Sequence, residues 1–346
     1  MDLADKLMNV IVVTVSLLAP FFLHQYRSLK AFISTARTLF KENVTGEVVL
    51  ITGASSGIGE HLAYEYARRG ARLALVARRK HRLQEVNEIC DIIGSPETVY
   101  ILGDVSNIED CKRFVDATVD HFGQLDHLVT NAGVAPVCLF EDYEDITKAL
   151  PAMDINFWGS AYSTYFALQH LRKSKGKIIV ISSCSSWVFA PRTGFYSASK
   201  AALISFYEAM RIELGTQIGI TIVTPGFIDT EMTEGKCLSK EGTLEVDREM
   251  RDVQVNVMPV ETAERCAKAI VESACRGDKY LTVPSWMHTT VLWRVFFPEM
   301  MDWWNGVMLM AGAGSSSRDA PSKKLLHVAT GIKQLFSLEA FLTPSK

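Results

Sequence analysis

From residue 47 onward, apolar runs and amphipathic segments alternate along the chain. Short runs such as Ile178 to Ile181 are continuously apolar, which is typical of strands that are covered on both faces. Repeated strand–helix units of this kind predict an α/β fold, a Rossmann-type doubly wound parallel sheet. The predicted strands are 47–52, 72–77, 98–102, 126–130, 177–182, 219–224 and 279–283, and the predicted helices are 58–69, 79–93, 107–122, 145–174, 194–217 and 259–275.

The N-terminal part of the chain has a different pattern. Residues 7–23 carry no charge, and their number just reaches the length of a membrane-spanning helix. A cleaved signal peptide is disfavoured because Asp2 and Asp5 precede the apolar run and no small-residue cleavage site follows it. We therefore expect an uncleaved signal-anchor.

The segment after the anchor predicts a helix that lies at a membrane interface. One stripe of this helix is apolar and basic residues follow its flank. The alternative is an ordinary amphipathic helix packed on the domain. More positive charge follows the anchor than precedes it, so the catalytic part should face the cytosol. The apolar stripe contains Phe22, Tyr26, Leu29, Ile33, Ala36 and Phe40, and the basic flank contains Arg27, Lys30, Arg37 and Lys41.

Composition narrows the function classes. The net charge of −3 gives no electrostatic basis for binding nucleic acid. Seven cysteines are scattered without a C-x-x-C pair, which fits a reducing compartment better than disulfides or a zinc site. We expect no bound metal.

A glycine-rich turn follows the first predicted strand and precedes a predicted helix. A strand, a glycine turn and a helix N-terminus together form a cradle for phosphate groups, because the turn lets a pyrophosphate approach the backbone and the helix presents unpaired N–H groups. A purely structural turn is the alternative. The candidate cofactor-binding residues here are Gly53, Ser55, Ser56, Gly57, Ile58 and Gly59.

The end of the second predicted strand indicates which dinucleotide binds. An acidic residue there would bind the adenosine ribose hydroxyls and select NAD, but Arg78 and Arg79 occupy this place. A guanidinium matches a 2′-phosphate with paired, charge-assisted hydrogen bonds. NADP is therefore the predicted cofactor, with a solvated helix start as the alternative.

Three polar residues suggest the chemistry. Tyr196 and Lys200 are four residues apart in a predicted helix and so lie on one face, and Ser183 ends a buried strand thirteen residues before the tyrosine. A nearby ammonium is expected to lower the tyrosine pKa. A tunable phenol and a serine that orients an oxygen suit the interconversion of alcohols and carbonyls, with a nicotinamide to carry the hydride.

Taken together, these motifs resemble the short-chain dehydrogenase/reductase family over about residues 46–285. The family carries T-G-x-x-x-G-x-G, N-A-G, an Asn within a helix, Ser, Y-x-x-x-K and P-G in this order. The resemblance implies Tyr196 as general acid/base, Lys200 as a ligand of the nicotinamide ribose, Ser183 as the residue that orients the substrate carbonyl, and Asn156 as the holder of a water in a proton relay. It implies further cofactor contacts from Asp104, Val105, Asn131, Ala132, Gly133, Pro225, Gly226 and Thr230.

Within that family the chain looks most like the plant 11-beta-hydroxysteroid dehydrogenase-like proteins, which include the steroleosins of seed oil bodies. The likeness rests on short segments, and the steroleosin anchor differs in usually carrying a cluster of prolines where this chain has only Pro20. The resemblance implies a steroid or sterol substrate and attachment to the endoplasmic reticulum or a lipid droplet. The segments are 62–67, 156–160, 199–203 and 224–228.

Residues 280–310 are rich in aromatic residues and methionine, which suits a flat hydrophobic ligand. A homodimer interface and a membrane contact explain the same composition equally well. We predict an anchor and amphipathic helix at 1–45, an NADP-binding domain at 46–285 and an aromatic-rich segment with a loosely ordered tail at 286–346. The family resemblance implies that the segment after Gly226, about 227–258, and the C-terminal region form the substrate pocket.

The sequence thus predicts an NADP-dependent dehydrogenase that acts on a hydroxyl or ketone of a hydrophobic, sterol-like molecule at a membrane or lipid droplet. A retinoid, a fatty ketone or a long-chain base is the alternative substrate. A catalytically silent sterol-binding protein of the lipid-droplet coat is the alternative from another class. The presence of Ser183, Tyr196 and Lys200 argues against it, because a binding protein does not need them.

Overall fold

The computed structural model describes residues 42–255, 258–310 and 320–326, so the predicted anchor and interfacial helix lie outside the described residues. Within those ranges, none of the helices is both long and apolar enough to cross a bilayer. The chain divides into two compact units, Met1–Asn43 and Val44–Lys346, and the sheet with its helices belongs to the second.

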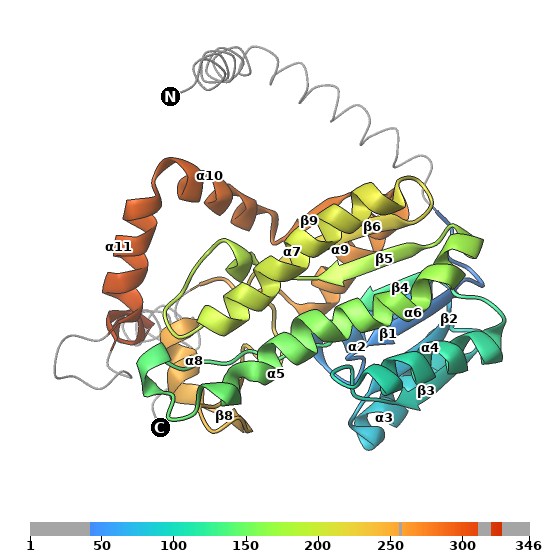
Figure 1. The fold of residues 1–346 in the computed structure, drawn as a ribbon, viewed down its shortest axis with the longest axis horizontal. Coiled ribbons are helices and arrows are strands. Elements are labelled where there is room, and N and C mark those ends of the chain that lie inside the picture. The colour runs from blue at the N-terminus through green and yellow to red at the C-terminus, as the bar shows by residue number, and fades with distance from the viewer. Residues whose placement is uncertain (1–41, 256–257, 311–319, 327–346) are drawn as a thin grey trace, which may run out of the picture. The chain divides into compact units, whose positions relative to one another are not determined.

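A parallel sheet of seven strands forms the centre of the fold (Figure 1). Its order is β3-β2-β1-β4-β5-β6-β9, which confirms the predicted doubly wound topology. β1 pairs with β2 on one side and with β4 on the other, so the direction of winding reverses between β1 and β4. In open α/β sheets, ligands bind beyond the carboxyl ends of strands at such a reversal. The strands are β1 (Val48–Thr52), β2 (Arg72–Ala77), β3 (Thr98–Leu102), β4 (His127–Thr130), β5 (Lys177–Ile181), β6 (Gly219–Pro225) and β9 (Tyr280–Val283).

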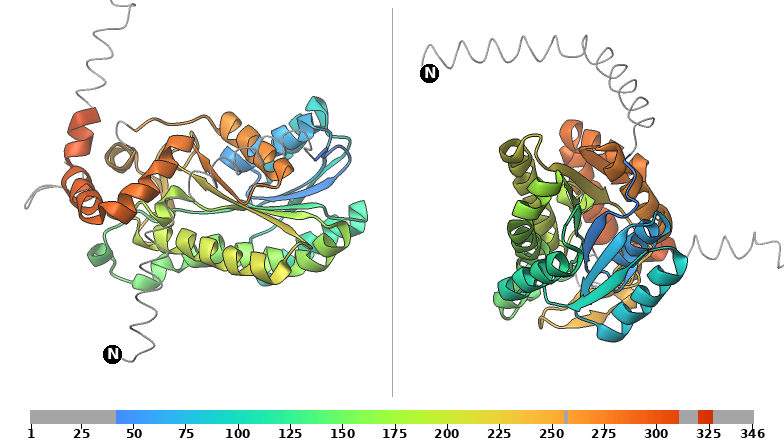
Figure 2. Two further views of the ribbon diagram at one scale, coloured as in Figure 1. Left: turned by 90° about the horizontal axis from the view of Figure 1, so that it is seen from above. Right: turned by 90° about the vertical axis from the view of Figure 1, so that its right-hand side faces the viewer.

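Helices cover both faces of the sheet (Figure 2). Successive strand residues point to opposite faces, so Val49 and Ile51 enter one hydrophobic core while Val48 and Leu50 enter the other. Both cores are buried, which explains why the strands are continuously apolar. α2 (Gly57–Arg68), α3 (Lys80–Ile93) and α9 (Ala263–Arg276) pack on the first core, and α4 (Ile108–Phe122), α6 (Gly159–Ser174) and α7 (Gly194–Leu214) pack on the second.

The predicted single helix at 145–174 is wrong in its first half. The structure has a 3-10 turn at Ile146–Ala149, a short helix α5 (Leu150–Met153), a π-helical turn at Asp154–Trp158 and then α6. Pro151 lies in the first turn of α5, where its missing N–H is not needed. The π turn contains the buried Asn156, and such turns are frequent at functional sites.

After β6 the chain makes an excursion, residues 227–261, before it returns to α9. The excursion contains an antiparallel hairpin of β7 (Lys236–Leu238) and β8 (Leu244–Val246), followed by α8 (Arg248–Gln254). Its two ends are joined: Ile228 and Glu261 form a parallel bridge, and Glu261 N–H donates to the Phe227 carbonyl at 2.9 Å. The family resemblance implied a pocket-forming segment at about residues 227–258 but not the elements within it.

Two short helices, α10 (Thr289–Phe296) and α11 (Pro298–Leu309), carry most of the aromatic-rich segment (Figure 1). The Arg294 guanidinium lies 4.3 Å above the ring centroid of Phe189, and Asn305 Nδ2 donates to the Phe189 carbonyl at 2.8 Å. These contacts attach the helices to the loop after β5. Their large side chains are mostly exposed to solvent, including Trp293, Phe296, Phe297, Trp303 and Trp304.

Candidate active site

A cavity of about 500 Å³ opens at the carboxyl ends of the central strands. It brings together every predicted site residue except Gly59 and Asn156, which lie directly behind its wall. The lining includes Gly53, Ser55, Ser56, Gly57, Ile58, Arg78, Arg79, Asp104, Val105, Asn131, Ala132, Gly133, Ser183, Tyr196, Lys200, Pro225, Gly226 and Thr230.

The glycine turn has no room for side chains. Gly53 and Gly57 have φ angles of +67° and +60°, which glycine adopts without strain. A Cβ on Gly59 would lie 2.3 Å from the Gly53 carbonyl oxygen and 2.4 Å from Asn131 Nδ2. The Ser56 side chain does not cap α2, so its hydroxyl does not occupy the N-terminal N–H groups of this helix, which are the groups that bind phosphate at helix N-termini.

Asn131 fastens the end of β4 to this turn. Its side-chain amide donates to the carbonyls of Thr52 and Gly53 at 3.0 and 3.2 Å, and its backbone N–H donates to Thr52 Oγ1 at 3.1 Å. Asn131 also lines the cavity, and the cofactor contact that the resemblance implies for it stays a prediction. The structure shows that its side chain holds the phosphate cradle in shape.

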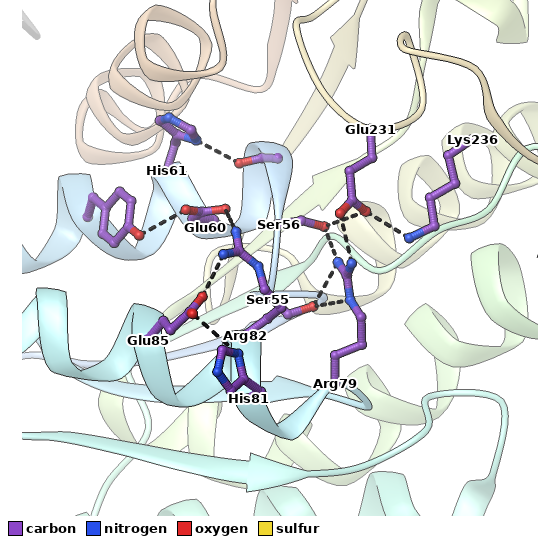
Figure 3. A network of polar contacts seen from close by, with 12 residues as sticks. Ser55, Ser56, Glu60, His61, Arg79, His81, Arg82, Glu85, Glu231 and Lys236 are labelled. Carbon is purple, nitrogen blue, oxygen red and sulfur yellow. Dashed lines mark hydrogen bonds and ion pairs between the residues drawn. The ribbon is translucent and has the colours of Figure 1, made fainter. Parts of the chain in front are cut away.

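The two arginines after β2 lie at the same end of the cavity in different surroundings. Arg78 forms an ion pair with Asp104 at 3.4 Å, and both side chains are partly exposed. Arg79 instead donates to Ser55, Ser56 and Glu231, which joins β2 to the glycine turn and to the excursion (Figure 3). The site therefore presents two guanidinium groups where the cofactor adenosine would lie.

Ser183, Tyr196 and Lys200 converge at the opposite end of the cavity. Lys200 Nζ donates to the Ile181 carbonyl at 3.0 Å and lies 5.8 Å from the ring centroid of Tyr196. Ser183 Oγ accepts from the Ser185 N–H at 3.1 Å and lies 3.5 Å from the Pro225 carbonyl oxygen. A phenol, an ammonium and a hydroxyl thus border one space.

The pKa of Tyr196 differs from the sequence-based prediction. Burial raises the pKa of Tyr196, and the hydrogen bond with Ser183 offsets only part of this effect. Burial also lowers the pKa of Lys200 to about 8, because water no longer stabilises the ammonium. The predicted lowering of the Tyr196 pKa is therefore wrong: burial raises this pKa above its ordinary value, and the phenol is protonated at neutral pH.

Asn156 supports the site from behind the cavity wall. Its Oδ1 accepts from the Val134 N–H at 2.8 Å, and its Nδ2 donates to the Val134 carbonyl at 2.9 Å and to Ser199 Oγ at 2.8 Å. These bonds tie the chain after Gly133 to the residue that precedes Lys200. A role in a water relay remains a prediction.

Sequence comparison decides the family. The family model described as short chain dehydrogenase matches residues 47–240. This chain belongs to the short-chain dehydrogenase family. The dehydrogenase is 52% identical over 338 residues to "11-beta-hydroxysteroid dehydrogenase-like 6" of Arabidopsis thaliana, a match that covers 97% of this chain and 99% of that protein. It is also 52% identical to "11-beta-hydroxysteroid dehydrogenase A" of Arachis hypogaea, over 93% of this chain and 92% of the relative.

Solved structures of related proteins share the fold of the dehydrogenase. A short-chain dehydrogenase/reductase from Burkholderia phymatum in complex with NAD superposes with a TM-score of 0.66 and 22% identity, covering 75% of this chain and 96% of that one. An alcohol dehydrogenase from Thermococcus sibiricus complexed with 5-hydroxy-NADP gives a TM-score of 0.57 and 25% identity, covering 68% and 95%. The two structures contain different nicotinamide cofactors, so the fold alone does not select one of them.

The cavity of the dehydrogenase fits such a dinucleotide. A Cβ at Gly57 would lie 2.9 Å from Thr230 Cγ2, so the space between the glycine turn and Thr230 has no room for a side chain here. The absence of a side chain leaves the backbone of Gly57 accessible to a ligand. The uncapped end of α2 and the arginines after β2 supply groups for a pyrophosphate and an adenosine phosphate. Tyr196 and Lys200 line the same cavity.

Sequence reasoning missed three functional residues of the dehydrogenase. Glu231 and Lys236 line the cavity from the excursion and bind each other, and Ser199 holds Asn156. In the sequence, Glu231 and Lys236 look like any solvated pair of charges, because nothing local shows that the excursion folds back over the glycine turn. Among the described residues, the aromatic side chains of 280–310 do not line this cavity.

Proposed function

We propose that this chain is an NADP-dependent dehydrogenase that interconverts a hydroxyl and a ketone on a hydrophobic, steroid- or sterol-like substrate. The observation that carries the proposal is the convergence of Ser183, Tyr196 and Lys200 on one cavity that also contains the phosphate cradle. The names of the plant relatives support a steroid-like substrate.

In this reaction the bound nicotinamide exchanges a hydride with the substrate carbon. Tyr196 moves the proton at its phenolic oxygen, and its raised pKa suits donation to a ketone oxygen. Ser183 lies beside it, where its hydroxyl can orient the same oxygen. Lys200 is placed to bind the nicotinamide ribose and to add positive charge beside the phenol.

Turnover of a panel of sterols, steroid ketones, retinoids and fatty ketones with NADP(H) tests this proposal. Turnover restricted to steroids or sterols would support it. If retinoids or fatty ketones are turned over instead, the proposed reaction stands and the proposed substrate class is wrong. Sterol binding without any cofactor-dependent turnover would replace the proposal with the catalytically silent binding protein.

For the cofactor, we expect NADP(H) to bind more tightly than NAD(H), and Arg78→Ala to narrow this preference about 10- to 100-fold. The reason is that a charge-assisted hydrogen bond contributes about 1.5–3 kcal/mol. Fluorescence titration of both cofactors measures the effect. Arg82→Ala is the matched control, because Arg82 lies in the first turn of α3, pairs with Glu60 and Glu85, and does not line the cavity. A wild type that prefers NAD(H) would show the NADP assignment to be wrong.

We further propose attachment to the endoplasmic reticulum or a lipid droplet through residues 1–41, with the catalytic unit in the cytosol. Deleting these residues should release a protein that still binds cofactor, since the sheet begins at Val48. The basic residues after the anchor add about 1 kcal/mol each near anionic lipid. Flotation of the full-length and truncated chains with liposomes measures the difference.

A double variant distinguishes residues 1–41 from the aromatic helices α10 and α11 as the membrane contact. Full-length protein with Trp303→Ser and Trp304→Ser should still float, because those tryptophans lie on α11 and outside the anchor. If the truncated chain floats and the double variant does not, the aromatic helices make the membrane contact. If the full-length chain stays soluble, the anchor hypothesis fails. A homodimer through α10 and α11 would appear in sedimentation as a mass that falls in the double variant.

A further inference from the structure

Glu231 occupies an anion site at the adenosine end of the cavity. Arg79 Nη1 donates to Glu231 Oε1 at 2.8 Å, and Lys236 Nζ donates to Glu231 Oε2 at 2.8 Å (Figure 3). Ser56 Oγ donates to the same Oε2 at 3.3 Å. Two cations and a hydroxyl from three separate segments therefore surround one carboxylate.

The Glu231 side chain carries a full negative charge in this site. Burial alone would raise its pKa, but the hydrogen bonds with Arg79 and Lys236 outweigh that effect and hold the pKa at about 2. The carboxylate stays ionised at every pH at which the enzyme would work. It thus resembles the phosphate that would bind beside it in the sign of its charge and in its hydrogen-bond-accepting oxygens.

Four of the five Arg79 N–H donors are already used, which leaves one N–H on Nη1 for a new ligand. Its Nε and Nη2 donate to Ser55 Oγ, Nη2 also donates to Ser56 Oγ, and Nη1 is bound to Glu231. A 2′-phosphate that binds Arg79 with two hydrogen bonds must therefore replace at least one of these partners. Glu231 is the only one of the three that is charged like the phosphate, so it is the partner that the phosphate repels.

Lys236 lowers the cost of that exchange. Lys236 and Glu231 both belong to the excursion, and their ion pair does not depend on β2 or the glycine turn. When Arg79 turns to a phosphate, the carboxylate keeps Lys236 as a partner. Glu231 can therefore release Arg79 and still be paired with a positive charge.

We propose that Glu231 is a specificity-determining residue that competes with the 2′-phosphate of NADP for Arg79. The inference rests on the proposed use of NADP. The competition weakens NADP binding while leaving NAD binding unaffected, because NAD carries no group that must displace the carboxylate. Glu231 thus keeps the NADP preference below the value that Arg78 and Arg79 alone would give.

The test compares Glu231→Gln with Glu234→Gln in the full-length protein. Glu234 lies in the same segment, is exposed and does not line the cavity, so its substitution removes the same charge without touching Arg79. Calorimetric titration with NADP⁺, NAD⁺, 2′,5′-ADP and 5′-AMP gives the four affinities. We expect Glu231→Gln to bind NADP⁺ and 2′,5′-ADP roughly 3- to 10-fold more tightly than Glu234→Gln, from the usual strength of an ion pair of this exposure. Affinities for NAD⁺ and 5′-AMP should stay within about twofold.

Adding Arg79→Ala should remove the gain, because the competition needs the guanidinium. Equal NADP⁺ affinity in the two Gln variants would overturn the proposal. So would weaker NAD⁺ binding in Glu231→Gln, since the carboxylate would then be a ligand of the adenosine ribose.

The proposed function fails separately from this inference. The wild-type preference between NADP⁺ and NAD⁺ tests the cofactor assignment, whereas the difference between the two Gln variants tests the competition. A wild type that prefers NAD⁺ would reject the NADP assignment. A Glu231→Gln variant that gains NADP⁺ affinity would still support the competition between Glu231 and the 2′-phosphate.

Discussion

Tyr196→Phe is expected to lower turnover about 10²–10⁴-fold, because proton transfer by a positioned group contributes that much to catalysis. The substitution removes only the phenolic oxygen, so the ring keeps its packing and cofactor affinity should change little. Steady-state rates on a ketone substrate and fluorescence titration of NADPH measure the two effects.

Tyr207→Phe is the matched control for this experiment. Tyr207 lies on the same helix, α7, is fully buried, and donates its hydroxyl to the Ser160 carbonyl at 3.0 Å. Losing that hydroxyl should lower the free energy of unfolding by about 1 kcal/mol without a comparable loss of rate. If Tyr196→Phe keeps more than a few per cent of the wild-type activity, Tyr196 is not the proton donor.

Gly59→Ala is expected to weaken cofactor binding about 100-fold and to lower the melting temperature. The added methyl has no space against the Gly53 carbonyl and the Asn131 amide, so the glycine turn must move, at a cost of about 1–3 kcal/mol. The same movement would disturb the N-terminus of α2 that faces the phosphates. Calorimetric titration and thermal unfolding measure both losses.

Gly306→Ala tests whether the effect comes from sterics or from glycine replacement in general. Gly306 lies within α11, and nothing approaches the position of its Cβ within 4 Å. Its unfolding free energy should stay the same or rise by up to about 1 kcal/mol, because alanine favours the helix. Cofactor affinity as strong in Gly59→Ala as in Gly306→Ala would show that the turn can accept a side chain.

The central sheet could be predicted from the sequence because its signal is local. Continuous apolar runs such as Ile178 to Ile181 determine both the strands and their burial. The cavity lining could be predicted for a related reason. In a parallel sheet the carboxyl ends of all strands meet at one edge, so Arg79, Asn131 and Ser183 come together once the strand order is given.

The features that could not be predicted depend on contacts between distant segments. The π turn at Asp154–Trp158 is recognisable only from the bonds that Asn156 makes with Val134 and Ser199. Glu231 meets Arg79 across 152 residues of chain. The pKa of Tyr196 was expected to fall because Lys200 is near in sequence, but the degree of burial of the pair is a property of the whole cavity.

The joined ends of the excursion make it a replaceable part of the molecule. Because Phe227, Ile228 and Glu261 bind across its base, we expect changes of sequence between them to leave the spacing between β6 and α9 intact, provided that the bridge from Leu238 to Pro136 is kept. Substitutions at Glu231 and Lys236 should then alter cofactor selectivity without moving Tyr196. Exchanging residues 227–261 between two related enzymes should then give a chimera with the cofactor selectivity of the donor.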